Sequence, residues 1–212
     1  MKFILCFFLA CLSCGIVKAQ NSMTKPTLDK QAVLDNILAA NNSVSTISCE
    51  FYEHLDHHEG EDKDKYCYGH MYYKAPSQFC MSYENSDDKI VVNGKKVHID
   101  HGIFRGTLNT WWSGRARKLR SLMLYSLQGN CELLAQENDY SLEVTEDDDY
   151  YVVTIQAEEK KMMTYHIIIL SYDKSSYKIQ KMHLVAYNDD EEFYDLRNIE
   201  YDKGVDDKVF EY

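Results

Sequence analysis

The sequence predicts an α+β fold made of a long antiparallel β-sheet and two substantial helices. Three observations support this prediction. Many segments alternate apolar and polar residues one by one, which is the period of a half-buried strand. Two segments instead have apolar residues at helical spacing, and the separators between strands are charged or polar, as exposed turns are. A sheet this long must close into a barrel or use the helices to cover its concave face.

The first helix is predicted close to the amino terminus. Thr27 or Asp29 can cap its first turn, and Asn41-Asn42-Ser43 breaks the pattern at its other end. Its apolar positions follow helical spacing and are Val33, Leu34, Ile37 and Leu38. The expected element is an amphipathic helix of about three turns.

Five strands are predicted to follow as a meander, in which each strand pairs with the next. In the first of them Ile47, Cys49 and Phe51 alternate with polar neighbours. The others are expected at 66–73, 79–83, 89–92 and 96–99, with turns at 57–62 and at Ala75-Pro76-Ser77. Asn93-Gly94 is a strong hairpin signal, because both residues tolerate the positive φ of a type I′ turn.

The second helix is predicted over residues 115–128. Leu119, Leu122, Met123 and Ser126 line one of its sides, and Gly129-Asn130 ends it. Alternating segments then resume. Strands are predicted at 142–144, 151–157, 164–172, 179–187 and 192–198.

The first residues indicate export. An apolar run from Phe3 to Val17 follows Lys2 and ends in Val17-Lys18-Ala19, a small-residue cleavage pattern. We therefore expect residues 1–19 to be a secretory signal peptide, cleaved near Ala19, and residues 20–212 to form one domain. At about 15 residues the run is short for a membrane span, which needs roughly 20. A lipoprotein signal, using Cys11 or Cys14, is the alternative.

The mature chain is expected to be strongly acidic. The whole sequence has a formal charge of −11. Without Lys2 and Lys18, 21 basic residues remain against 34 acidic ones, which gives a charge near −13. This balance argues against binding to nucleic acid and against simple adsorption to anionic lipid.

Four cysteines remain after the predicted cleavage, namely Cys49, Cys67, Cys80 and Cys131. Their spacing contains no CxxC and matches no zinc pattern. Cys49 and Cys67 fall on neighbouring predicted strands with side chains on the same face, so a cross-strand disulfide is one interpretation. The other is that these cysteines are small buried hydrophobic residues.

The sequence contains no recognisable catalytic motif. GxSxG, GxxxxGK and GxGxxG do not occur. His54, His57 and His58, with Asp56 and Glu59, are candidates for a metal site, but their segment has the composition of a turn and lacks HExxH spacing. We therefore expect a protein that is not an enzyme and has no metal and no cofactor.

One basic cluster stands out in this acidic chain and consists of Arg115, Arg117, Lys118 and Arg120. It is interpreted either as the solvated side of the second helix or as a docking patch for an acidic partner or for lipid headgroups. Trp111-Trp112 directly precedes the cluster, either as an exposed anchor or as buried aromatic residues.

The order of several motifs carries a resemblance to a known family. Lys74-Ala75-Pro76 is followed by Phe79-X-Met81-X-Tyr83, an acidic turn, Ile90-Val91-Val92 and Asn93-Gly94-Lys95. This order resembles the periplasmic outer-membrane lipoprotein carrier proteins, the LolA-like family, and the similarity covers most of the mature chain. The chain looks particularly like the versions found in Bacteroidota, whose signal peptides often end in Ala-Gln, as Ala19-Gln20 does.

The resemblance implies an unclosed, strongly curved antiparallel β-barrel with helices over its mouth. It implies that an apolar hollow takes the acyl chains of a lipoprotein, or of a related amphiphilic lipid, from an inner-membrane release complex and delivers them to an outer-membrane acceptor. A periplasmic monomer is expected. The residues facing the hollow would be Ile47, Phe51, Met71, Tyr73, Phe79, Met81 and Tyr83, and those of the helical lid Leu34, Ile37, Leu38, Leu119, Leu122 and Met123.

One position departs from the family pattern. In the family an arginine commonly precedes the proline that corresponds to Pro76 and holds the lid closed through hydrogen bonds, whereas this chain has Ala75. Either the lid is held differently or the cargo differs. The alternative function is a secreted structural or interaction domain of the same fold, whose hollow is filled by side chains. The volume of the hollow distinguishes the two, because a lipid tail needs several hundred cubic ångströms.

Overall fold

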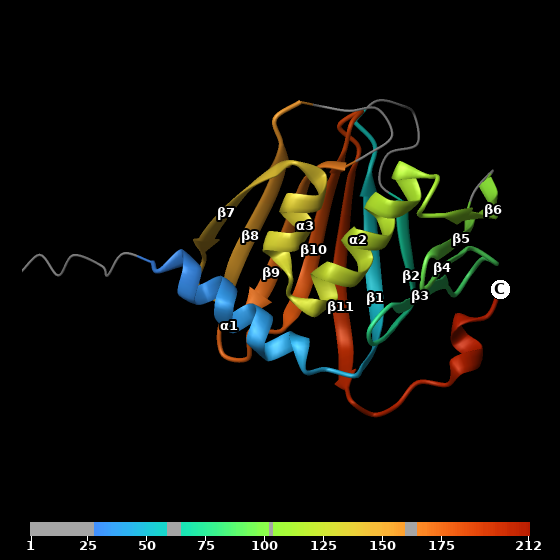
Figure 1. Ribbon diagram of the computed structural model, residues 1–212, viewed down its shortest axis with the longest axis horizontal. Helices are drawn as coiled ribbons and strands as arrows, with labels where there is room; N and C mark the ends of the chain where they lie inside the picture. The colour runs from blue at the N-terminus through green and yellow to red at the C-terminus, as the bar shows by residue number, and fades with distance from the viewer. Residues whose placement is uncertain (1–27, 59–64, 102–103, 160–164) are drawn as a thin grey trace, which may run out of the picture.

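The computed structural model describes residues 28–58, 65–101, 104–159 and 165–212. These residues form two layers, an antiparallel sheet of eleven strands and a layer of helices over one of its faces (Figure 1). Within the described residues the two edge strands do not pair with each other, so the curved sheet stays open. The predicted α+β fold with an unclosed barrel is confirmed.

The order of the strands across the sheet is β6-β5-β4-β3-β2-β1-β11-β10-β9-β8-β7. The chain thus builds one half outward from the middle, crosses to the opposite edge through the helices, and builds the second half back toward the middle. The halves join where β1 pairs with β11, and Phe51 lies opposite Leu196 at this junction. The helices that connect the halves therefore lie across the face of the sheet (Figure 1).

The first half has six strands, one more than predicted. Their bounds are β1 Thr46–Asp56, β2 Lys65–Lys74, β3 Gln78–Tyr83, β4 Lys89–Asn93, β5 Lys96–His101 and β6 Phe104–Asn109. The predicted hairpin at Asn93-Gly94 joins β4 and β5, with Gly94 at a φ of 61°. The additional strand is β6, whose apolar pattern is interrupted by Arg105 and Gly106.

The second half has five strands, as predicted. Their bounds are β7 Tyr140–Glu146, β8 Tyr150–Ala157, β9 Tyr165–Asp173, β10 Ile179–Ala186 and β11 Glu191–Tyr201. β7 is longer at both ends than the prediction of 142–144. The predicted start of β9, at residue 164, lies outside the described residues.

The two predicted helices begin and end at the signals present in the sequence. The Asp29 side chain caps α1 (Lys30–Asn42) by accepting a hydrogen bond from an amide of its first turn at 3.1 Å. Ser113 caps α2 (Gly114–Gln128) in the same way at 3.2 Å. Gly129 ends α2 with a φ of 67°, a left-handed value that glycine adopts without steric cost.

A third helix, α3 (Cys131–Asn138), is absent from the sequence prediction. The Asn130 side chain caps it by accepting from the amide of Leu133 at 3.4 Å. Gly129-Asn130 therefore ends one helix and starts the next, whereas the sequence pattern predicts only a stop. A short 3-10 helix, η1 (Asp207–Phe210), is also an addition to the prediction.

The main hydrophobic core lies between the sheet and the three helices. Neighbouring residues of β3 take part in different clusters. Phe79 and Met81 belong to the large core under the helices, whereas Cys80 packs with Val91 and Phe210 of η1. β3 is therefore buried on both of its faces.

The four cysteines of the described residues are free thiols. The register of β1 and β2 places Met71 opposite Cys49 and Glu53 opposite Cys67, so the two cysteines are four positions apart along the strand pair. At ~3.3 Å per residue that offset is about 13 Å, beyond the roughly 7 Å that a disulfide spans between Cα atoms. The interpretation as a disulfide is therefore wrong. Cys67 is partly exposed, and the other three are buried.

Candidate functional site

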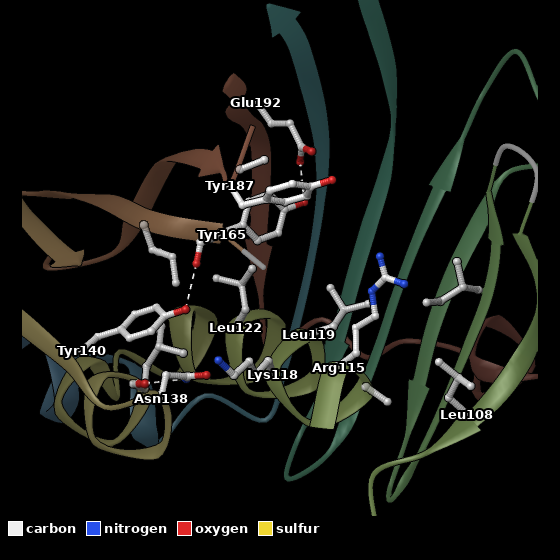
Figure 2. Close-up of a pocket in the computed structure, with 15 residues that line it drawn as sticks. Leu108, Arg115, Lys118, Leu119, Leu122, Asn138, Tyr140, Tyr165, Tyr187 and Glu192 are labelled. Atoms are coloured by element: carbon white, nitrogen blue, oxygen red, sulfur yellow. Dashed lines mark hydrogen bonds between the residues drawn. The ribbon is translucent and has the colours of Figure 1, made fainter. Parts of the chain in front are cut away.

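A cavity of about 270 Å³ lies between the helices and the sheet. α2 and α3 form one wall, and strands from both halves of the sheet form the others (Figure 2). The apolar side chains that surround it are Ile99, Leu108, Leu119, Leu122, Leu134 and Ile168. A partly open space with such walls suits the apolar part of a ligand.

Charged and polar groups occupy two sides of this cavity. Arg115 and Lys118 of α2 lie on one side, and Glu192 of β11 with Tyr165 of β9 on another (Figure 2). Lys118 Nζ lies 5.4 Å from the ring centroid of Tyr140. The Tyr140 hydroxyl donates to the carbonyl oxygen of Tyr165 at 2.8 Å. The cavity is thus apolar at its centre, with cationic and acidic groups at separate places on its rim.

A partly buried hydrogen-bond network links the carboxyl groups of Glu192 and Glu53 through tyrosines. The Tyr165 hydroxyl donates to Glu192 Oε2 at 2.8 Å. The Tyr194 hydroxyl lies 2.9 Å from the same oxygen and 2.7 Å from Glu53 Oε1. Because Tyr194 has one hydroxyl proton, it donates to one of the two carboxylates only. Both contacts are hydrogen bonds when one carboxyl group is protonated and donates to Tyr194.

The surroundings of Glu192 favour that protonated form. Burial is the main cause that raises the pKa of Glu192, to about 7; the hydrogen bonds of Tyr165 and Tyr194 act against it, and the charges of Glu53 and Asp190 add to it. Burial also raises the pKa of Tyr165 and Tyr194 well above the usual value of tyrosine. Near neutral pH the tyrosines therefore remain donors while Glu192 gains or loses its proton.

The strand residues predicted to face a hollow lie in the main core. Six of them are at most 3% exposed, namely Ile47, Phe51, Met71, Tyr73, Phe79 and Met81. Tyr83 is half-buried and packs edge-on against Phe51, with ring centroids 5.2 Å apart. The walls of the 270 Å³ cavity are formed by other residues. Contact between these seven side chains and a ligand therefore stays a prediction.

The predicted lid residues lie on α1 and α2, and two of them reach the cavity. Leu119 and Leu122 form part of its wall (Figure 2). Leu34, Ile37 and Met123 are buried in the main core, and Leu38 is half-buried. α2 is thus the helix that brings the predicted lid into contact with the cavity.

Sequence reasoning missed most of the cavity wall. Ile99 and Ile168 lie in correctly predicted strands, but alternation does not tell which strand face adjoins a cavity and which a filled core. Leu108 and Leu134 belong to β6 and α3, the two elements that were not predicted. Glu192 begins the last predicted strand. It follows other acidic residues, so the sequence does not distinguish it from the charged residues of an exposed turn.

Several polar contacts hold α2 to the sheet, and in one of them the hydroxyl of Tyr172 in β9 donates to the carbonyl oxygen of Ser126 at 3.0 Å. Gln128 Nε2 donates to the hydroxyl of Tyr73 and to the carbonyl oxygen of Pro76, both at 3.0 Å. Arg120 Nε donates to the carbonyl oxygen of Gly94 at 2.8 Å. Ala75, where the family commonly has an arginine, is exposed. Gln128 of the lid therefore contacts Pro76, the residue directly after Ala75, where the arginine is absent.

A second depression, of about 440 Å³, lies between α1, α3 and β7. It is more open than the first, and its wall carries Lys30, Glu132 and Gln136 beside Leu34. The smaller cavity under α2 is better enclosed by apolar side chains. We therefore regard the cavity under α2 as the candidate site.

Two histidines of the segment 54–58, His54 and His57, have other partners. His54 stacks on Tyr66 and Phe193, with ring centroids 4.6 and 5.6 Å away. His57 Nδ1 lies 3.2 Å from a carboxylate oxygen of Asp190. In the described ranges no group of three or more metal-ligating side chains comes together. Glu59 lies outside the described residues.

No helix among the described residues combines the length and the apolar character that a membrane span requires. The predicted signal peptide, residues 1–19, lies outside the part of the chain that the structure describes.

The sequence matches the family model described as outer membrane lipoprotein carrier protein LolA over residues 42–212. The fold is similar to that of a LolA superfamily protein, NE2245, from Nitrosomonas europaea, with a TM-score of 0.46 and 11% identity over 86% of this chain and 97% of that one. An uncharacterized conserved protein from Thermus thermophilus gives a TM-score of 0.51 and 7% identity over 86% and 93%.

The MucA/MucB complex structure from Pseudomonas aeruginosa gives a TM-score of 0.49 and 11% identity, covering 87% of this chain and 61% of that one. No curated protein sequence matches this chain. At these identities the similarity to solved structures concerns the fold alone.

Proposed function

This chain belongs to the LolA family of outer membrane lipoprotein carrier proteins, and we propose that it is itself a periplasmic carrier without catalytic activity. It holds the acyl chains of a lipoprotein, or of a related amphiphilic lipid, during transfer from an inner-membrane release complex to an outer-membrane acceptor. Export by the predicted signal peptide is part of this proposal. The observation that carries it is the apolar cavity under α2.

The energetics of an acyl chain support a covered carrier. Each methylene that leaves water contributes about 0.8 kcal/mol, so an uncovered chain would not cross an aqueous compartment. The cavity of about 270 Å³ is slightly smaller than typical ligand pockets, which measure roughly 300–1,000 Å³. In the proposed loaded state α2 therefore moves away from the sheet, and the space extends toward the predicted strand face that includes Phe79 and Met81.

The alternative function, an interaction domain without lipid cargo, is favoured by one observation. The seven strand residues predicted to face the hollow are packed into or against a continuous core. A binding measurement separates the two functions, because only the carrier binds an acyl chain at the cavity.

The test is a fluorescent fatty-acyl probe, titrated into the exported protein and into Leu119→Glu. Leu119 is half-buried at the cavity, so a carboxylate there meets the acyl chain without entering the closed core. We expect Leu119→Glu to weaken binding at least about tenfold, which corresponds to about 1.4 kcal/mol.

The matched control is Leu133→Glu, since Leu133 is a half-buried leucine of α3 outside the cavity wall. This variant should keep the wild-type affinity. Native mass spectrometry of the wild-type protein, followed by lipid extraction, identifies any co-purifying cargo. A protein that carries no lipid and does not bind the probe would overturn the proposal in favour of the interaction domain.

Gln128→Ala tests whether the contacts of α2 control release. The change removes two hydrogen bonds between lid and sheet, each worth about 1 kcal/mol. We expect faster amide hydrogen exchange at the end of α2 and roughly five- to tenfold faster dissociation of the acyl probe. Gln136→Ala, at an exposed position of α3, is the control. Equal dissociation rates for the two variants would show that Gln128 does not hold the lid.

A further inference from the structure

Two adjacent tryptophans are exposed in the turn between β6 and α2. The exposed fraction is 65% for Trp111 and 91% for Trp112. Tryptophan is buried to a large extent in most proteins, so an exposed pair at one place indicates a contact surface. The sequence allowed this pair to be either buried or exposed, and the structure shows that both tryptophans are exposed.

The turn that presents the tryptophans is held by its own hydrogen bonds. Asn109 Oδ1 accepts from the amide of Trp111 at 2.9 Å. The carbonyl oxygen of Asn109 accepts from the amides of Trp112 and Ser113 at 3.2 and 3.0 Å. Ser113 then caps α2. Both indole rings are therefore displayed by a defined backbone turn at the start of a helix.

Basic side chains surround this turn. Lys95 Nζ lies 4.4 Å from the ring centroid of Trp111. Arg115 and Arg117 are exposed on the first turns of α2. Residues 94–120 contain seven of the 23 basic residues of the chain and a single acidic residue. A chain with a charge of −11 thus contains one strongly basic segment.

The one acidic residue of segment 94–120 is Asp100, and its carboxylate is paired with Arg105 at 2.8 Å. The negative charge of Asp100 is therefore offset by Arg105. The charge of the remaining chain is screened beyond the Debye length of about 8 Å at physiological ionic strength. Local attraction by the basic side chains therefore outweighs the overall negative charge at short range.

The same surface adjoins the candidate cavity. Arg115 is one of the cavity-lining residues, and Figure 2 shows it between Leu119 of α2 and Leu108 of β6. Tryptophans at the level of lipid headgroups, combined with arginine and lysine facing phosphates, are the chemistry of a bilayer interface. Tryptophan and arginine are also enriched at protein interfaces, but two adjacent indoles that are 65% and 91% exposed beside basic side chains match the aromatic anchors of a bilayer surface more closely.

We propose that Trp111 and Trp112, together with Lys95, Arg115 and Arg117, dock the cavity side of this protein onto an anionic phospholipid bilayer. The indoles enter the headgroup region and the basic side chains bind lipid phosphates. The docking goes beyond the carrier function and does not depend on it, because it is a property of the protein surface and is measured without cargo.

The experiment uses the tryptophans themselves as reporters. The chain contains two tryptophans in total, both in this turn, so all indole fluorescence comes from the proposed surface. The exported protein is titrated with vesicles of phosphatidylcholine, with or without phosphatidylglycerol. We expect a blue shift of the emission, quenching by brominated acyl chains, and binding that requires phosphatidylglycerol and weakens with added salt.

Three variants separate the possible outcomes in vesicle co-sedimentation. The double variant Trp111→Ser/Trp112→Ser should bind vesicles at least about tenfold more weakly. The double variant Arg115→Glu/Arg117→Glu should also bind at least about tenfold more weakly, because it loses the attraction to anionic lipid. Tyr66→Ser removes an aromatic side chain that is 55% exposed elsewhere and should bind as the wild type does. Circular dichroism confirms the fold of each variant.

Either of two results overturns the proposal. One is that the wild-type emission does not shift with any vesicle. The other is that the tryptophan and arginine variants sediment with vesicles as the wild type does, which would place the contact elsewhere. If vesicles are not bound but the same variants lose binding to an acidic partner protein, the surface is a protein interface. Failure of the acyl-probe titration, in contrast, leaves this result unaffected.

Discussion

Gly69→Ala is expected to lower the free energy of unfolding by about 4 kcal/mol or more, a loss found only where a structural feature is broken. A Cβ atom at residue 69 would lie 2.0 Å from the carbonyl oxygen of Ser82 and 2.9 Å from Cζ of Phe51. The first of these is a backbone atom, held in place by the pairing of β2 with β3. The two strands must therefore move apart to admit a methyl group.

The measurement is urea or thermal unfolding of the wild type and the variant. A loss of about 4 kcal/mol corresponds to roughly 8–16 °C in Tm for a chain of this size. Gly114→Ala is the control, because a Cβ there meets no atom within 4 Å and the change should leave stability equal or raise it slightly. A Gly69→Ala variant as stable as this control would contradict the close approach of β2 and β3.

Glu192→Gln is expected to remove a pH dependence of stability. Glu192 has a pKa of about 7 in the folded protein, against 4.5 as its ordinary value. Between these two values the folded state holds a proton that the unfolded state has released, so the free energy of unfolding falls as the pH rises from 4.5 to 7. The loss amounts to about 3 kcal/mol and is complete above the folded pKa.

Glutamine keeps an oxygen that accepts from Tyr165, and it has no charge. The variant should therefore be more stable than the wild type at about pH 8, by about 3 kcal/mol, and equal to it near pH 4. Urea unfolding at several pH values measures the free energy of unfolding of the variant and of the wild type. Glu200→Gln, at an exposed position of β11, should keep the slope of the wild type. The same slope in Glu192→Gln would show that another group titrates.

The elements that the sequence predicted well are those whose local signals are complete. α1 and α2 each combine apolar residues at helical spacing with a capping side chain, Asp29 or Ser113, and a stop. The strands alternate over five or more residues in most cases. The errors arose where signals overlap or are short. α3 has eight residues, and its cap directly follows the glycine that ends α2.

The candidate site was predictable in part. Leu119 and Leu122 were expected on the inner side of a lid, because helical spacing fixes which residues of α2 share a face. The strand residues Phe79 and Met81 were correctly expected on one face of β3. The alternation of apolar and polar residues, however, is the same in a strand that faces a dry core and in one that faces a cavity. In this fold Phe79 and Met81 lie in the core.

The sequence by itself determined the α+β fold and the two amphipathic helices, since local periodicity and turn chemistry depend on neighbours in the chain, and the order of its motifs carried the resemblance to the family. Only the tertiary structure decided where the cavity lies, because its walls come from α2, α3 and both halves of the sheet. The hydrogen-bond network of Glu192 likewise needs Tyr165 and Glu53, which register and strand order bring together from β9 and β1. The exposure of Trp111 and Trp112 was decided in the same way, since burial depends on which elements pack over a residue and not on the residue type.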